Sequence, residues 1–104
     1  RQEGEQTVFD VELCADHLIY RAHFPGHPIT PGVCVMQMVC ELAAEIVGHP
    51  VHMTGAKNVK FLAPIIPTAT PRVTVRMIVE PIRIVAAVEE GEQVMAKLSL
   101  CHEA

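Results

Sequence analysis

The sequence predicts an α+β fold in which one antiparallel sheet curves around a single long helix. The first observation is a nearly unbroken apolar run from about Pro31 to Val47, which is long enough for a buried helix. The second is that segments on both sides of this run alternate apolar and polar residues, with the two-residue period of half-buried strands. Because such a sheet has one apolar face and the chain offers one helix to cover it, the helix is expected to lie inside the curve of the sheet.

Composition narrows the class of protein. The chain has 104 residues, is expected to form one domain over residues 1–104, and carries a formal net charge of -4 with scattered Lys and Arg, which argues against nucleic-acid binding. Gln37 and Glu41 interrupt the longest apolar run, so no membrane span is expected. The cysteines show no CxxC spacing and are interpreted as free thiols of a cytoplasmic protein, and the histidines show no metal-site spacing, so neither a metal nor a cofactor is expected. The four cysteines are Cys14, Cys34, Cys40 and Cys101.

Local sequence patterns predict the elements before the helix and the position at which the helix ends. Residues 1–6 are polar and are expected to be frayed. Residues 7–13 then alternate, which predicts a strand with Phe9, Val11 and Leu13 on its apolar face. A loop follows as far as Ala22. The helix is expected to stop at 48–50, where Gly-His-Pro supplies a C-terminal cap and a proline just beyond it.

The second half of the chain predicts four strand-like segments. Residues 51–62 are extended in character with a break at Gly55, and a proline-rich loop separates them from the next strand. Residues 72–79 and 82–88 alternate, residues 89–92 have the composition of a hairpin turn, and a last strand follows. The apolar faces are expected to be Val73, Val75, Met77 and Val79; Ile82, Ile84, Ala86 and Val88; and Val94, Ala96, Leu98 and Leu100.

The start of the helix has the features of a binding site. The preceding segment, HFPGHPITPG, contains His23 and His27 in a proline-rich loop. Thr30 suits the N-cap and Pro31 the first helical position, while Gly32 leaves the backbone open to a ligand. Free amides at a helix N-terminus carry positive partial charge, so this end of the helix suits a carbonyl oxygen or an anion.

The segments HFPGHPITPG and KNVKFLAPIIP, with the helix between them, resemble the hot-dog-fold 3-hydroxyacyl-(acyl carrier protein) dehydratases of fatty acid synthesis. This resemblance implies a lyase of fatty acid or related lipid or polyketide synthesis. It also implies at least a homodimer, with acyl thioesters of acyl carrier protein or coenzyme A bound at the interface. His23 matches the histidine that takes part in proton transfer, and the Gly32 and Val33 amides match those that hold the thioester carbonyl. Phe24, beside His23, is assigned to substrate binding.

The chain departs from this family at the general acid. Elimination of water needs a base, a polarising contact for the carbonyl and an acid for the departing hydroxide. The family carries its acid as Glu or Asp on the helix of the partner subunit, but the matching residue here is Gln37, whose amide cannot supply a proton. Glu41 stands one turn further on, where the family commonly has Gln. Either Glu41 supplies the acid or the site has lost its acid. Because the backbone amides fix the position of the carbonyl, the substrate has little freedom to shift toward Glu41. This favours a site that has lost the acid or has been redirected to another function.

The same residues are also compatible with two other functions. One is a hot-dog thioesterase, in which Glu41 would direct water at the carbonyl. The other is a catalytically degenerate acyl-binding subunit that supports an active partner. The chain begins at Arg1, which suggests a processed or trimmed start, and an upstream segment usual in the family is expected to be missing.

Overall fold

The computed structural model describes residues 1–13, 32–66 and 72–103, and these ranges contain one helix and one six-stranded sheet. The strands are β1 (Gln2–Glu3), β2 (Gln6–Glu12), β3 (Met53–Phe61), β4 (Arg72–Val79), β5 (Arg83–Glu90) and β6 (Gln93–His102), and the helix is α2 (Gly32–Val47). The helix therefore begins and ends within one residue of its predicted limits. The predicted strands all form, but β3 runs through Gly55, where a break was expected, and shows there a register shift against β6.

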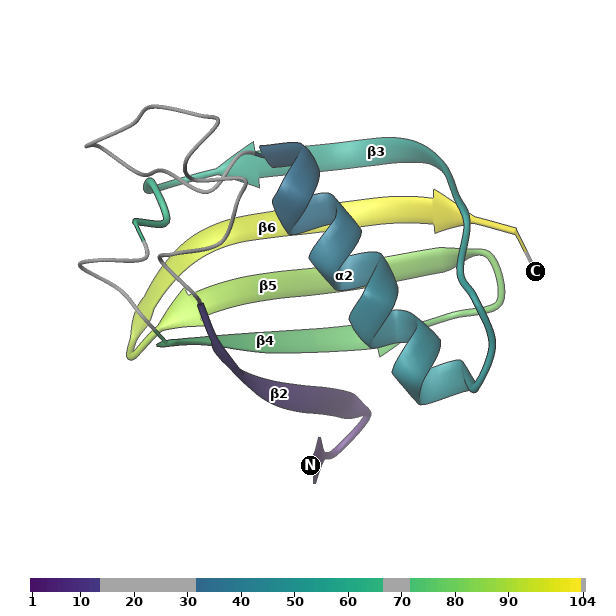
Figure 1. Ribbon diagram of the computed structural model, residues 1–104, viewed down its shortest axis with the longest axis horizontal. Coiled ribbons are helices and arrows are strands. Elements are labelled where there is room, and N and C mark those ends of the chain that lie inside the picture. Colours follow the sequence, from purple (N-terminus) through teal and green to yellow (C-terminus); the bar gives the residue numbers. More distant parts are fainter. Residues whose placement is uncertain (14–31, 67–71, 104) are drawn as a thin grey trace.

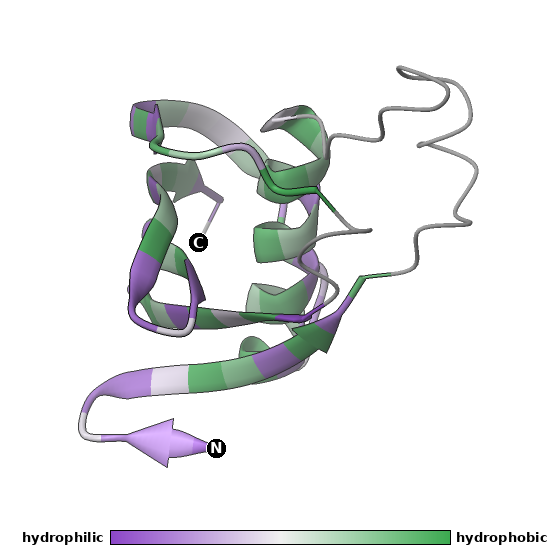
Figure 2. Ribbon diagram, turned by 90° about the vertical axis from the view of Figure 1, so that its left-hand side faces the viewer, coloured by the Kyte–Doolittle hydropathy of each residue, from purple (hydrophilic) through white to green (hydrophobic). Residues whose placement is uncertain are grey.

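The sheet has the order β1-β2-β4-β5-β6-β3, and each neighbouring pair is antiparallel. Figure 1 shows α2 lying across one face of this sheet, and the view in Figure 2 shows the strands bending around it. The predicted arrangement of a curved sheet around a helix is confirmed. β3 follows α2 in sequence and forms one edge of the sheet, beside β6. Figure 1 shows that the end of β3 lies next to the start of α2.

The helix α2 is held by the side chains that it turns toward the sheet. Val35, Val39, Cys40 and Ala43 are buried, and they recur at the three- and four-residue spacing of one helical face. Gly48 ends the helix with a φ of 80°, a left-handed conformation that costs glycine little, and its amide donates a hydrogen bond to the carbonyl of residue 44 at 2.8 Å.

The alternating strands supply the other side of the core. Their buried side chains include Val73, Val75 and Met77 of β4; Ile84, Ala86 and Val88 of β5; and Ala96, Leu98 and Leu100 of β6. The predicted apolar faces are confirmed at these positions. The prediction was wrong for Ile82, which is 63% exposed because it precedes β5 and lies outside the regular alternation.

The last strand also differs from its predicted pattern at its start. The register between β5 and β6 shifts because Val88 faces Ala96 while Glu89 faces Val94, which leaves Met95 as an extra residue. Such a bulge turns the extra side chain without breaking the sheet. Met95 is therefore buried, and Val94 is only half-buried.

Truncating the core is expected to cost far more stability than truncating the surface. Leu100→Ala removes a fully buried side chain and should lower the free energy of unfolding by about 2–5 kcal/mol. Ile82→Ala, which shortens an exposed side chain of the same class, should change it by less than about 0.5 kcal/mol. Urea unfolding followed by circular dichroism measures both values. Similar midpoints for the two variants would contradict the core described above.

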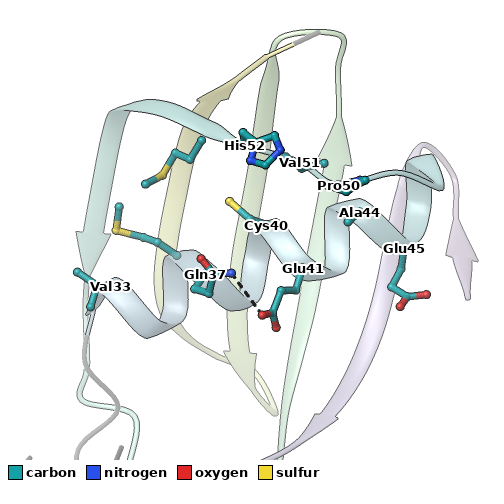
Figure 3. A pocket seen from close by; sticks show the side chains of 11 residues that line it. Val33, Gln37, Cys40, Glu41, Ala44, Glu45, Pro50, Val51 and His52 are labelled. Atoms are coloured by element: carbon teal, nitrogen blue, oxygen red, sulfur yellow. Dashed lines mark hydrogen bonds between the residues drawn. The ribbon is translucent and has the colours of Figure 1, made fainter.

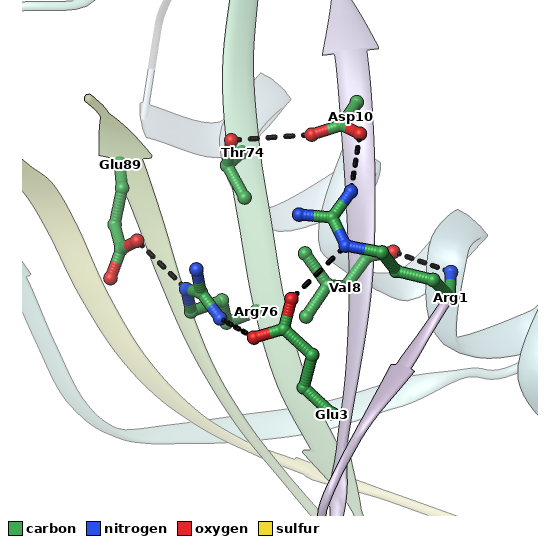
Figure 4. Close-up of polar contacts among 7 residues, drawn as sticks. All are labelled: Arg1, Glu3, Val8, Asp10, Thr74, Arg76 and Glu89. Carbon is green, nitrogen blue, oxygen red and sulfur yellow. Dashed lines mark hydrogen bonds and ion pairs between the residues drawn. The ribbon is translucent and has the colours of Figure 1, made fainter.

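The N-terminal residues are ordered, contrary to the expectation that they are frayed. β1 pairs with β2 through a tight turn in which Gly4 has a φ of 61°. On the outer face of the sheet, Figure 4 shows Glu3 accepting hydrogen bonds from Arg76 at 2.7 Å and Arg1 at 3.0 Å. These two guanidinium groups hold the pKa of the Glu3 carboxyl below its usual range. Pairing across distant strands, which no local pattern records, orders this segment.

Candidate functional site

An open groove lies between α2 and the segment that links α2 to β3. Figure 3 shows its two walls, which are α2 and the segment between α2 and β3. The groove has a volume of about 890 Å³. Its apolar lining includes Val33, Met36, Cys40, Ala44 and Val51. The polar side chains of Gln37, Glu41, Glu45 and His52 line the same groove, so an acyl chain bound on its apolar part would lie beside polar groups.

Gln37 and Glu41 lie side by side on the wall that α2 forms. The Gln37 Nε2 atom donates a hydrogen bond to Glu41 Oε1 at 3.3 Å, and both side chains are exposed (Figure 3). The spacing of four residues places both on one helical face, as the sequence predicts. Of the two, only the Glu41 carboxyl group can carry a proton, and the amide of Gln37 orients it.

The start of α2 lies at one end of this groove. Gly32 is the first helical residue, and Val33, which lines the groove, is 72% exposed. The first amides of an α-helix have no partner within the helix, and the first turn of α2 carries no acidic side chain that would compete for them. This end of the groove therefore suits a carbonyl oxygen on which negative charge develops. His23, Phe24, Thr30 and Pro31 lie outside the described residues.

Cys40 and His52 are two further chemical groups of the groove. Burial raises the pKa of the Cys40 thiol, and the neighbouring Glu41 carboxylate raises it further, so the thiol stays protonated at neutral pH. Cys40 is thus a packing residue and not a nucleophile. His52 is exposed on the other wall (Figure 3). Cys34, Cys40 and Cys101 are free thiols.

The described residues offer neither a metal site nor a membrane-spanning helix. Among these residues no group of three or more His, Cys, Asp or Glu side chains could hold a metal ion. In the same part of the chain, no helix is both long and apolar enough to cross a membrane.

The structure adds Phe61 to the neighbourhood of the site. This residue ends β3, and its ring lies directly against Gly32 at the start of α2. The sequence contained a signal for it, since Phe61 belongs to the KNVKFLAPIIP segment quoted above. Sequence reasoning gave Phe61 no role, because only the pairing of β3 with β6 brings it to the helix.

Comparison with protein families identifies a relationship over most of the chain. The model of a family described as ApeI dehydratase, or ApeI-like, matches residues 1–98. The 3-hydroxyacyl-[acyl-carrier-protein] dehydratase FabZ of Thermomicrobium roseum is 27% identical over 81 residues, which are 71% of this chain and 54% of that protein. FabZ of Enterococcus faecalis is 26% identical over 98 residues, which are 88% of this chain and 67% of that protein. The chain spans about half the length of the first of these relatives.

Solved structures agree with the fold. The dehydratase heterocomplex ApeI:P from Xenorhabdus doucetiae superimposes with a TM-score of 0.81 at 16% identity, over 98% of this chain and 90% of that chain. A protein of undescribed function from Erwinia carotovora subsp. atroseptica superimposes with a TM-score of 0.69 at 20% identity, over 99% of this chain and 86% of that chain. The match over residues 1–98 and the sheet curved around α2 lead to one conclusion: this chain has the hot-dog fold and belongs to the ApeI-like dehydratase family.

Proposed function

We propose that the protein is a 3-hydroxyacyl-thioester dehydratase that acts on acyl chains carried by acyl carrier protein or coenzyme A. The observation that carries this proposal is the open groove beside α2, which has the start of the helix at one end, apolar side chains in its lining, and the hydrogen-bonded pair Gln37 and Glu41 along its wall. The family match and the dehydratase names of the relatives support the reaction type. A cytoplasmic setting agrees with the free thiols of the described cysteines.

In the proposed reaction, His23 removes a proton from the carbon next to the thioester carbonyl. The amides of Gly32 and Val33 stabilise the negative charge that develops on the carbonyl oxygen. Glu41 gives its proton to the hydroxyl group on the next carbon, which leaves as water while the carbon–carbon double bond forms. Gln37 holds the Glu41 carboxyl group in place through the 3.3 Å hydrogen bond.

We also propose that two copies of the chain pair along β3. This strand has β6 on one side and no neighbour on its other side among the described residues, and an open edge with apolar side chains is suited to pairing. Met53, Phe61 and Leu62 are exposed along or just beyond it. Pairing there would cover the groove and bring His23 of one subunit toward Glu41 of the partner, as the family resemblance implies.

A direct assay tests the proposed reaction. Purified protein should interconvert a short 3-hydroxyacyl thioester and the corresponding 2-enoyl thioester, followed by the ultraviolet absorbance of the conjugated enoyl group. Carrier-linked and coenzyme A-linked substrates should be compared in parallel. Release of free thiol in the same mixtures, without formation of the enoyl product, would identify a thioesterase and reject the dehydratase.

The second candidate is a subunit that works only with a complete dehydratase. Gln37, which stands where the family has its carboxylate, favours this candidate, and the structural neighbour from Xenorhabdus doucetiae is described as a heterocomplex. On this account the partner supplies the acid. Copurification with a homologue that carries the carboxylate, together with activity only in the mixed complex, would distinguish this candidate from the first.

A further inference from the structure

The contact between Phe61 and Gly32 is unusually close for two residues so distant in sequence. A methyl group placed on the Gly32 Cα atom would lie 3.0 Å from both Cε2 and Cζ of the Phe61 ring, and 3.8 Å from Cε1. Carbon atoms pack at about 3.5–4.0 Å, so no side chain fits at position 32 unless the ring moves. The aromatic ring thus lies on the backbone of the first residue of α2.

The backbone around Phe61 is fixed to the sheet, which places its side chain beside the start of α2. Phe61 pairs with Ala96 of β6. The next two amides, those of Leu62 and Ala63, both donate hydrogen bonds to the carbonyl of Met95, at 2.8 and 3.2 Å. Met95 is the buried extra residue of the β6 bulge, so its carbonyl is itself held in place. The position of the Phe61 backbone therefore follows from the sheet and not from the helix that the ring touches.

We propose that Phe61 is a positioning residue of the dehydratase site, an inference that rests on the proposed function. Its ring holds the start of α2 so that the amides of Gly32 and Val33 keep their direction toward the thioester carbonyl. Phe61 is 49% exposed, so the part of its ring that does not pack on Gly32 is available to shield the hydrogen bonds between these amides and the carbonyl oxygen from water. A hydrogen bond to a developing oxyanion is stronger where water is excluded.

This role predicts how variants of Phe61 should behave. A displacement of about 1 Å in a catalytic contact can cost on the order of 10²-fold in rate. Phe61→Ala should therefore lower kcat by about 10- to 100-fold, with KM changed much less, because the contact strengthens as charge develops on the oxygen. Phe61→Leu, which keeps part of the apolar surface, should lie between wild type and Phe61→Ala. Ile82→Ala, an exposed apolar truncation at a residue outside the groove, should leave kcat unchanged.

A spectroscopic measurement separates positioning from a general effect on folding. The infrared carbonyl stretch of a bound, isotope-labelled 2-enoyl thioester reports how strongly the amides polarise that carbonyl. Binding to wild-type protein should lower this frequency. Phe61→Ala and Phe61→Leu should lose part of that shift while still binding the thioester, and Phe61→Leu keeps the test open if the alanine variant fails to fold.

A paired variant tests the contact itself. Gly32→Ala should lower kcat because its methyl group displaces the ring, and the added change Phe61→Leu should recover part of the loss by making room. If wild type binds the thioester with a lowered frequency but Phe61→Ala and Phe61→Leu show the same frequency and kcat, Phe61 is not a positioning residue. If wild type neither binds nor converts the thioester, the dehydratase proposal itself is wrong, and the role of Phe61 falls with it.

Discussion

Replacing Glu41 by Gln is expected to lower the rate of dehydration by about 10²- to 10⁴-fold, the contribution typical of a general acid. The change keeps the size of the side chain and leaves an oxygen that can accept the hydrogen bond from Gln37, so the geometry of the groove should persist. What disappears is the proton for the departing hydroxide. Initial rates with a saturating 3-hydroxyacyl thioester measure the effect, and KM should change much less than kcat.

Two further variants make this prediction specific. Glu92→Gln removes an exposed carboxylate in the turn before β6, remote from the groove, and should leave the rate unchanged. Gln37→Glu restores a carboxyl group at the position where the family has one. If Glu41→Gln has no effect and Gln37→Glu raises the rate, Glu41 is not the acid. The chain would then have lost this group, as the degenerate-subunit alternative requires.

Replacing His23 by Ala is expected to lower the rate by a similar factor, about 10²- to 10⁴-fold, because the variant lacks the proposed base. An imidazole titrates near neutral pH, which suits it to accept a proton from the substrate, and Ala cannot. The measurement is the same initial-rate assay with the same thioester. Binding of the enoyl thioester should persist in the variant, since the described residues that line the groove beside α2 are unchanged.

Mixing the His23→Ala and Glu41→Gln proteins tests whether each site draws on two subunits. If subunits exchange freely in a symmetric dimer, half of the dimers are mixed, and each mixed dimer has one site with both wild-type residues. The mixture should then recover about a quarter of the wild-type rate. A mixture as inactive as its two components, after mass spectrometry has verified that mixed dimers form, would mean that each site draws both residues from one subunit.

Local periodicity was sufficient for most of the fold. The two-residue alternation along 72–79 predicted β4, because burial on one face leaves a period in the sequence. The length of the apolar run that ends before Gly48 predicted α2. The i, i+4 spacing of Gln37 and Glu41 likewise predicted that the two side chains meet. The roles proposed for His23 and Phe24 rest on the family motif and remain predictions.

Tertiary pairing decided the remaining features. β1 is ordered by its pairing with β2, and the bulge at Met95 depends on the register between β5 and β6. The contact of Phe61 with Gly32 joins two residues that the chain separates by the length of α2 and of β3. A sequence records which side of an element is buried, because that property is local. Which residues meet across elements is decided by strand order and register, and these become defined only when the whole sheet closes around α2.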